Sequence, residues 1–253
     1  MKTVIVTGAS SGLGREFAEV LGNLPEVEEI WLIARRGDRL VELQATIRAK
    51  VVPFSLDLSL FSSLEQYRIA LADRNPEVIA LVNAAGYGRF GEVEHISLLD
   101  QLGMVDVNVS ALTAITYHTL PYMERGGEIY QIASRSAFQP VPYMSVYGAT
   151  KSYVLSFSRG LNRELKHRGI HVMAVCPGWI RTEFFDRAAQ QPDVIQYYNR
   201  FHSVSQVVSR AMRDMKRKKD VSVCGPTLRF QRLLAKILPH RFVMWIWCRQ
   251  QKK

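Results

Sequence analysis

Cysteine is scarce in this chain of 253 residues, which holds only Cys176, Cys224 and Cys248. The three are far apart and show neither the CxxC spacing of redox motifs nor the paired spacing of zinc sites. We therefore expect three free thiols in a reducing compartment and no metal centre. The same scarcity excludes a small secreted domain held together by disulfides.

Long apolar runs, leader segments and linkers are also missing from the sequence. No apolar run reaches the roughly 20 residues that a membrane-spanning helix needs. The amino terminus enters a strand pattern at once, without the charged leader, apolar core and cleavage site of a secretory signal. No repeat or Pro/Gly/Ser-rich linker divides the chain. We expect a cytoplasmic protein with one domain over residues 1–227 and an extension over 228–253.

Negative charge is in the minority, with 23 Asp and Glu against 33 Lys and Arg, and the formal net charge is +10. Much of the excess lies between Lys216 and Lys253. A positive balance suits an anionic partner, such as nucleotide phosphates, a membrane surface or nucleic acid. No nucleic-acid-binding motif accompanies the charge, so we expect no nucleic acid partner.

Seven short β-branched or apolar runs alternate with helical patterns along the chain. They lack strict polar alternation, which predicts strands buried on both faces, as in a parallel sheet covered by helices. The intervening segments are long enough for crossover helices, so the pattern predicts an α/β fold with a doubly wound, seven-stranded parallel sheet and helices on both faces. The runs are 3–7, 30–34, 51–56, 78–82, 128–133, 170–176 and 221–224.

A glycine-rich turn follows the first predicted strand, in the string TGASSGLG of residues 7–14, and a helical pattern begins at Arg15. Gly8 permits a tight turn, while Gly12 and Gly14 let the backbone approach a phosphate and pack helix against strand. The helix N-terminus offers unpaired N–H groups to the anion. The alternative is a tight strand-to-helix connection without a ligand.

Two arginines, Arg35 and Arg36, follow the second predicted strand. NAD-specific folds usually have an acid here that binds the ribose 2′-hydroxyl, whereas an arginine suits the 2′-phosphate of NADP(H). Guanidinium groups bind phosphate bidentately and stack on adenine. The alternative is that both are solvated side chains at a helix start, and Asp38, one turn later, argues against a firmer assignment.

Tyr147 and Lys151 are four residues apart in a helical pattern that extends from Ser145 to His167, which brings both to one face. A free tyrosine has a pKa of about 10, and a neighbouring cation favours its phenolate. We expect Lys151 to lower the pKa of Tyr147. Ser134 follows the fifth strand, where strand ends line the ligand crevice, and its hydroxyl is placed to donate to a substrate carbonyl.

These motifs together resemble the short-chain dehydrogenase/reductase family. TGASSGLG matches its TGxxxGxG signature, and the YGATK string of residues 147–151 matches its Tyr-Lys pair. NAAG at 83–86 is close to the family's NNAG, with Ala84 as a departure, and PGWIRT at 177–182 matches PGxxxT. The resemblance implies a Rossmann-type fold and a nicotinamide-dependent oxidoreductase.

The resemblance also implies residue roles. Tyr147 is the proton donor or acceptor, Ser134 polarises the substrate oxygen, Lys151 assists and holds the nicotinamide ribose, and Asn108 joins the catalytic set through water. The cofactor is expected to be NADP(H), with NAD(H) as the second choice. The residues implied to bind it are Gly8, Ser10, Ser11, Gly12, Leu13, Gly14, Arg35, Arg36, Asp57, Leu58, Asn83, Ala84, Gly86, Tyr147, Lys151, Pro177, Gly178, Ile180 and Thr182.

Residues 183–203 occupy the family's variable substrate loop and are rich in aromatic side chains. They favour an apolar carbonyl or alcohol substrate such as a steroid, retinoid or acyl compound, although aromatic residues also pack in cores without binding ligands. Phe138 stands where a small residue is usual and is expected to narrow the pocket. His202 is expected to be structural or exposed. The aromatic residues are Phe184, Phe185, Tyr197, Tyr198 and Phe201.

The tail, 228–253, mixes basic and large apolar residues at helical spacing. One interpretation is a helix in a membrane interface, with Trp at headgroup level. The other, which we favour, is that it covers the substrate pocket or a subunit interface. The resemblance implies a homodimer or homotetramer through the helices that contain Asn108 and Tyr147.

The function predicted from the sequence is NADP(H)-dependent hydride transfer to or from a small apolar carbonyl or alcohol. A second hypothesis is a cofactor-binding sensor or scaffold without turnover. The retained Tyr147 and Lys151 favour the enzyme. A third hypothesis is a peripheral membrane protein in which membrane binding by the tail is more important than catalysis.

Overall fold

A computed structural model describes residues 1–188, 194–198 and 201–253 of the chain. Its central sheet has seven parallel strands in the order β3-β2-β1-β4-β5-β6-β9. Each predicted run forms one of them, so the strand prediction is confirmed. The strands are β1 (Lys2–Thr7), β2 (Glu29–Ala34), β3 (Lys50–Ser55), β4 (Glu77–Asn83), β5 (Glu128–Ile132), β6 (His171–Val175) and β9 (Val221–Ser222).

The inner strands are buried on both faces, as their continuous apolar patterns indicate. All six residues of β2 are buried, and β1 is buried after Lys2. The strand order reverses between β1 and β4, and the crevice at the carboxyl ends of the strands beside such a switch point is where doubly wound sheets bind ligands. A second sheet pairs two short strands that the sequence did not predict, β7 (Trp179–Ile180) and β8 (Phe201–His202).

One face of the sheet packs against α1 (Gly12–Gly22), α2 (Gly37–Glu42) and α8 (Val204–Lys216). Phe17 of α1 and Val207 of α8 belong to the same apolar cluster as Val4 and Val6 of β1. Helix α1 therefore lies directly over the strand that leads into the glycine-rich turn.

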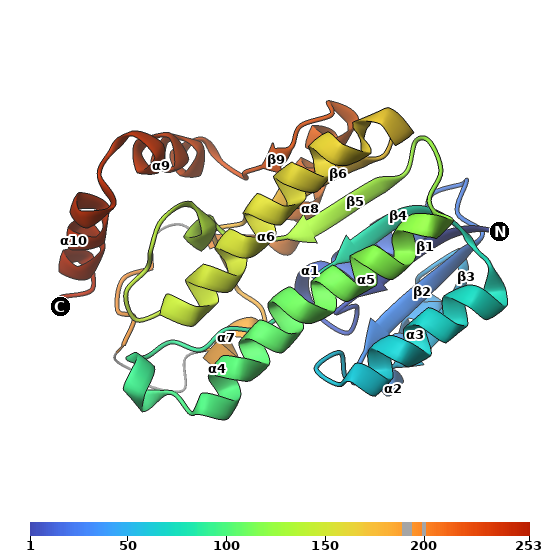
Figure 1. Cartoon of the computed structure of the whole chain (residues 1–253), viewed down its shortest axis with the longest axis horizontal. Coiled ribbons are helices and arrows are strands. Elements are labelled where there is room, and N and C mark those ends of the chain that lie inside the picture. The colour runs from blue at the N-terminus through green and yellow to red at the C-terminus, as the bar shows by residue number, and fades with distance from the viewer. Residues whose placement is uncertain (189–193, 199–200) are drawn as a thin grey trace.

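The opposite face packs against α3 (Phe61–Arg74), α5 (Leu112–Thr119) and α6 (Ser145–Glu164), which lie in front of the sheet in Figure 1. Tyr67, Ile115 and Leu161 bring these helices into a cluster with Ile5 and Trp31 of the sheet. Together with the 3-10 turn η6 (Leu165–Arg168), α6 confirms the helix predicted from Ser145 to His167. Helices thus cover both faces, as predicted.

A continuous helical stretch from Leu98 to Tyr122 comprises α4 (Leu98–Val105), the π-helical segment η3 (Asp106–Ala111), α5 and η4 (Leu120–Tyr122). By length and composition it is apolar enough to cross a membrane, a test that core helices of soluble proteins also pass. Ala111 and Ile115 pack it against the sheet.

The tail forms α9 (Pro226–Ile237) and α10 (His240–Gln250), so its predicted helical character is confirmed. In Figure 1 both helices extend past the carboxyl ends of the strands, away from the amino terminus. Leu228 belongs to an apolar cluster with Val154 and Ala174, which joins α9 to the body of the protein. The domain boundary after residue 227 stays a prediction. The remaining short elements are η1 (Leu43–Ala45), η2 (Val93–His95), η5 (Arg135–Phe138) and α7 (Phe184–Ala188).

Candidate active site

A cavity of about 1270 Å³ opens at the carboxyl ends of the strands. Its walls are the glycine-rich turn after β1, the loops after β2 to β6, α7, and the two tail helices. Its volume exceeds the several hundred cubic ångströms typical of a single small-ligand pocket, which leaves room for a dinucleotide and a second molecule.

The glycine-rich turn is shaped for close approach of backbone to backbone. Gly8 and Gly12 have φ of 68° and 54°, in the region that favours glycine. A Cβ on Gly14 would lie 2.2 Å from the carbonyl oxygen of Gly8, so no side chain fits there. Helix α1 begins directly after Ser11, and no side-chain oxygen caps its first N–H groups. These features suit a diphosphate at the helix N-terminus.

The end of β2 carries a cluster of arginines beside the turn. Arg36 donates to Ser10 Oγ at 3.0 Å and pairs with Glu183 at 2.6 Å, and Arg39 pairs with the same carboxylate. Arg35 lies 4.0 Å from Asp57. Both arginine hydrogen bonds hold the pKa of Glu183 below its ordinary value. The sequence did not reveal Glu183, because it lies 147 residues beyond Arg36.

Tyr147, Ser134 and Lys151 meet inside the cavity. Tyr147 and Lys151 lie on α6, and Ser134 follows β5. The Ser134 hydroxyl interacts with Tyr147, which is only 7% exposed. Lys151 Nζ donates to the carbonyl of Ile132 at 2.8 Å and lies 5.8 Å from the centre of the tyrosine ring. The three residues that the sequence predicts to be catalytic thus line one cavity together.

Burial dominates the titration of this set. It raises the pKa of Tyr147 to about 12, with the Ser134 hydrogen bond as the opposing influence, and lowers the pKa of Lys151 to about 8. The phenol pKa therefore lies above its ordinary value, and the lowering that we expected from Lys151 is absent. The reason is that Lys151 is aimed at a backbone carbonyl and is itself desolvated.

Asn108 is fully buried in the π-helical segment and does not line the cavity. Its Oδ1 accepts from the N–H of Tyr87, and its Nδ2 donates to the Tyr87 carbonyl and to Thr150 Oγ1. These bonds join the loop after β4 to the first turns of α6, so Asn108 positions the segment that holds Tyr147. The water link to the catalytic set stays a prediction.

All residues that the sequence assigned to the cofactor line the cavity, with the exception of Asn83. The Asn83 side chain, at the end of β4, is buried and donates to Thr116 Oγ1 of α5 at 3.0 Å. Its neighbours Ala84 and Gly86 do line the cavity. Thr182 lies directly over the glycine-rich turn, since a Cβ on Gly12 would be 3.3 Å from its methyl group.

The substrate end of the cavity is aromatic. Phe184, Phe185 and Tyr197 line it. Tyr198 and Phe201 do not; they pack around Phe185 with ring centres 5.6 and 5.7 Å from it. The five predicted aromatics therefore divide into a lining set and a supporting set, and Phe138 joins the lining as expected.

The tail closes this end of the cavity, as the favoured interpretation predicted. Leu228, Arg232 and Trp247 line it. Trp247 Nε1 donates to the carbonyl of Pro142 at 3.0 Å, and fully buried Gln251 accepts at 2.9 Å from the N–H groups of residues 196 and 197. Trp247 and Gln251 thus fasten the tail to the loops around the substrate space.

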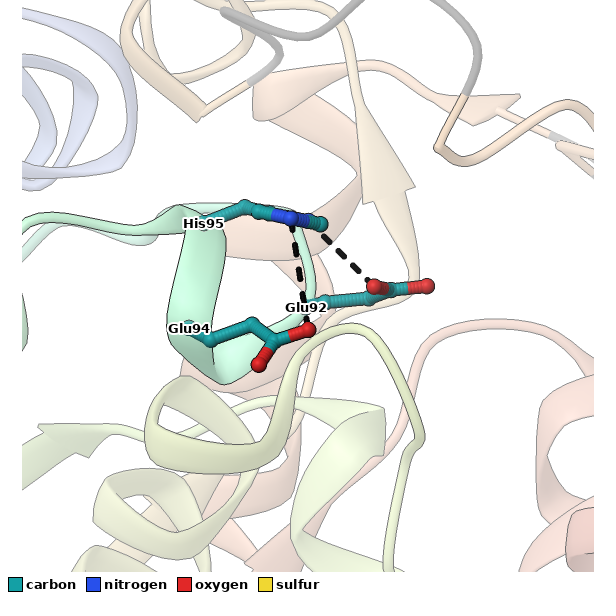
Figure 2. A group of neighbouring side chains, drawn as sticks. All are labelled: Glu92, Glu94 and His95. Atoms are coloured by element: carbon teal, nitrogen blue, oxygen red, sulfur yellow. Dashed lines mark ion pairs between the residues drawn. The ribbon is translucent and has the colours of Figure 1, made fainter.

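None of the six histidines, all of which the structure describes, lines the cavity. His202 is half-buried against Gly225, in line with the structural role expected of it. His95 forms an exposed group with Glu92 and Glu94, in which the paired atoms are 3.3 and 4.0 Å apart (Figure 2). Exposed acids of this kind are common without an ion, and we assign the group no role.

A dinucleotide cradle that shares one cavity with a buried tyrosine and lysine defines a class of nicotinamide-dependent oxidoreductases. Comparison with known families agrees: the family model described as short chain dehydrogenase matches residues 2–193. The chain belongs to the short chain dehydrogenase family. The family, the Rossmann-type sheet and the oxidoreductase class predicted from the sequence are thereby confirmed.

Relatives and solved structures extend the likeness. Serine 3-dehydrogenase of Rhizobium radiobacter is 32% identical over 187 residues, 72% of this chain and 73% of that protein. NADP-dependent 3-hydroxy acid dehydrogenase of Schizosaccharomyces pombe is 31% identical over 190 residues, which cover 72% of this chain and 73% of that protein. A short-chain dehydrogenase from Sphingobium yanoikuyae, solved with NADPH, superposes with a TM-score of 0.79 at 29% identity and covers 94% of each chain.

Proposed function

We propose that this protein is an NADP(H)-dependent oxidoreductase that reduces an apolar carbonyl compound or oxidises the corresponding alcohol. The observation that carries the proposal is that buried Tyr147 shares one cavity with Ser134, the glycine-rich turn and the arginines after β2. The NADPH-bound neighbour and the NADP-dependent relative support the same cofactor.

In this proposal the chain holds the cofactor along the strand ends. The turn from Gly8 to Gly14 binds the diphosphate, Arg35 meets the 2′-phosphate, and Thr182 lies at the nicotinamide end. The nicotinamide supplies or accepts the hydride. Tyr147 gives a proton to the substrate oxygen or removes one, the Ser134 hydroxyl donates to that oxygen, and Lys151 holds the nicotinamide ribose.

The direct test is NADPH oxidation by the purified protein offered a panel of apolar ketones and aldehydes, with NADH in parallel. Turnover that favours NADPH supports both the reaction and the cofactor. Turnover that favours NADH contradicts the assignment of Arg35. Cofactor binding without turnover across the panel points instead to a sensor or scaffold.

Replacement of Arg35 by serine should separate the two cofactors. Arg35 is half-exposed and lies 4.0 Å from Asp57, whereas Arg36 is held by Glu183. Loss of a charge-assisted bond worth about 1.5–3 kcal/mol should raise the KM for NADPH about 10- to 100-fold. The KM for NADH should stay within about threefold, because NADH lacks the phosphate.

The matched control is Arg68→Ser, which removes an exposed arginine of α3 paired with Glu65, away from the cavity. It should leave both KM values unchanged. Equal effects of Arg35→Ser on the two cofactors would show that Arg35 does not read the 2′-phosphate.

The apolar character of the substrate is supported by the lining itself. Phe184 and Phe185 come from α7, Tyr197 from the segment before β8, and Leu228 and Trp247 from the tail. These side chains favour a substrate with an extended apolar body, since aromatic surfaces gain most from contact with apolar groups.

We also propose that the outer face of the tail contacts anionic membranes. Phe230, Leu233, Ile237, Phe242 and Trp245 are exposed on it. Residues 226–253 contain no acid and carry basic side chains throughout. Apolar side chains on a basic helix suit the interface of an anionic bilayer. The protein would then be cytoplasmic and in part membrane-associated.

Leu233→Glu with Ile237→Glu should lower co-sedimentation with phosphatidylserine-containing vesicles about tenfold or more, since each side chain contributes roughly 1.5–3 kcal/mol when buried. Phe61→Glu, at an exposed apolar position at the start of α3, is the control. Vesicle binding that is equal in all three proteins would remove the membrane role.

We propose further that the protein is a homodimer or homotetramer through the helices that hold Asn108 and Tyr147. Leu98, Val105 and Tyr117 leave an exposed apolar stripe along α4 and α5. Exposed apolar stripes of this kind suit a symmetric interface between copies. A monomeric mass by light scattering at micromolar concentration would contradict this.

A further inference from the structure

The end of the cavity between η5 and the tail holds several hydrogen-bond donors that have no acceptor among the residues that the structure describes. The guanidinium group of Arg135 lies 5.1 Å from the ring centre of Trp179 and 5.9 Å from that of Trp247. Arg232 of α9 lies 5.5 Å over the ring of Phe138. Within the described part of the chain, neither guanidinium group has a carboxylate at ion-pairing distance or a side-chain hydrogen bond. Both arginines line the cavity.

The acids that line the cavity do not neutralise this end. Four acids line the cavity. Glu183 is paired with Arg36 and Arg39, Asp57 lies 4.0 Å from Arg35, and Asp100 is paired with Arg89. Asp106 is exposed on η3. Among the described residues, none of these four acids forms an ion pair with Arg135 or Arg232.

Two neutral donors in the same region also have no partner among the described residues. Trp179 Nε1 and Ser136 Oγ are buried without a hydrogen bond, and both residues line the cavity. A buried donor without an acceptor costs free energy. Arg135 is half-buried, and partial burial lowers its pKa to about 10. The indole rings of Trp179 and Trp247 offer its guanidinium group cation–π contact but no hydrogen-bond acceptor.

We propose that Arg135 and Arg232, with the Trp179 indole N–H beside them, bind an anionic oxygen group on the substrate. The ligand class is an amphipathic compound with an apolar body, a carbonyl or alcohol carbon, and a carboxylate or phosphate. This inference rests on the proposed function and narrows its substrate class.

The position of Arg135 supports this role. It follows Ser134 directly in the chain, so one loop holds the reacting oxygen and the anionic group. Guanidinium groups bind carboxylate and phosphate through two parallel hydrogen bonds, which orient the substrate as well as raise its affinity. Arg232 lies beyond residues 2–193, the part that the family model matches, so the tail supplies one of the two arginines of this subsite.

The test compares a medium-chain oxo acid with its methyl ester, which differ in the anionic charge. The unmodified enzyme should prefer the acid about 10- to 100-fold in kcat/KM, the range expected for charge-assisted hydrogen bonds. In Arg135→Gln and in Arg232→Gln the acid-to-ester ratio should fall about tenfold. Arg181→Gln is the matched control, because Arg181 also lies over an aromatic ring, that of Phe201. It should leave the acid-to-ester ratio unchanged, since Arg181 does not line the cavity.

A binding measurement separates this inference from the proposed reaction. Trp179 and Trp247 flank Arg135, so tryptophan fluorescence should change when decanoate or decyl phosphate is titrated into the protein, and change much less with decanol. The anion that binds with the higher affinity identifies carboxylate or phosphate as the natural group.

The outcomes are distinct. Anion-selective binding that is lost in Arg135→Gln, together with no turnover of the oxo acid or its ester, would support the anion subsite and contradict the proposed reaction. Turnover with equal preference for acid and ester keeps the reaction and overturns the anion subsite, as would equal binding of decanoate and decanol.

Discussion

Tyr147→Phe should lower kcat for carbonyl reduction by about 10³-fold or more, near the upper range for loss of a general acid. The substitution removes only the hydroxyl, and the ring keeps its packing against Phe184, 5.5 Å away between centres. NADPH binding and thermal stability should therefore be retained. Steady-state NADPH oxidation, with cofactor titration in parallel, measures both.

The matched control is Tyr153→Phe on the same helix. Tyr153 is half-exposed, bonds Thr113 and does not line the cavity, so turnover should remain within about twofold. More than a tenth of normal turnover in Tyr147→Phe would show that another group supplies the proton.

The pH dependence follows from the same phenol. Reduction needs the protonated form, and burial raises the pKa of Tyr147 to about 12, so reduction should not lose its acid near neutrality. Alcohol oxidation needs the phenolate, so its rate should rise with pH over the same range. A reduction rate that falls across neutrality with the pKa of an ordinary histidine would contradict this assignment.

Gly14→Ala should abolish detectable NADPH binding and lower the free energy of unfolding by about 1–3 kcal/mol, the usual cost of overpacking. The new Cβ would lie 2.2 Å from the Gly8 carbonyl oxygen and 2.7 Å from its carbon. Because both neighbours are backbone atoms, the turn itself must move, and the cradle for the diphosphate moves with it. Thermal denaturation and a fluorescence titration with NADPH measure the two effects.

Gly160→Ala makes the same chemical change where there is room for it. Gly160 lies in α6, is exposed, and a Cβ there would meet nothing within 4 Å. Alanine should raise the free energy of unfolding by about 0.5–1 kcal/mol, since it is the better helix former. Normal NADPH binding by Gly14→Ala would contradict the assigned role of the turn.

The strands and the main site motifs were predictable because their determinants are local. The run at 30–34 is apolar throughout, and β2 is buried at every position. Tyr147 and Lys151 share a helix, so a spacing of four residues suffices to bring them to one face. TGASSGLG spans one turn, where glycine is needed for steric reasons that hold within that turn.

Contacts between distant segments were not predictable in this way. Glu183 meets Arg36 across 147 residues, and Trp247 meets Pro142 across 105. The pKa of Tyr147 was expected to fall and instead rises, because the sequence shows that Lys151 is near but not that it points to Ile132.

By itself the sequence determined the doubly wound sheet, the glycine-rich turn and the pairing of Tyr147 with Lys151, because periodicity and short spacing specify them. Only the tertiary structure decided which face of the tail closes the cavity, which acids neutralise which arginines, and how deeply the catalytic set is buried. These depend on the packing of segments that are remote in the chain, and desolvation and charge compensation exist only after those segments have come together.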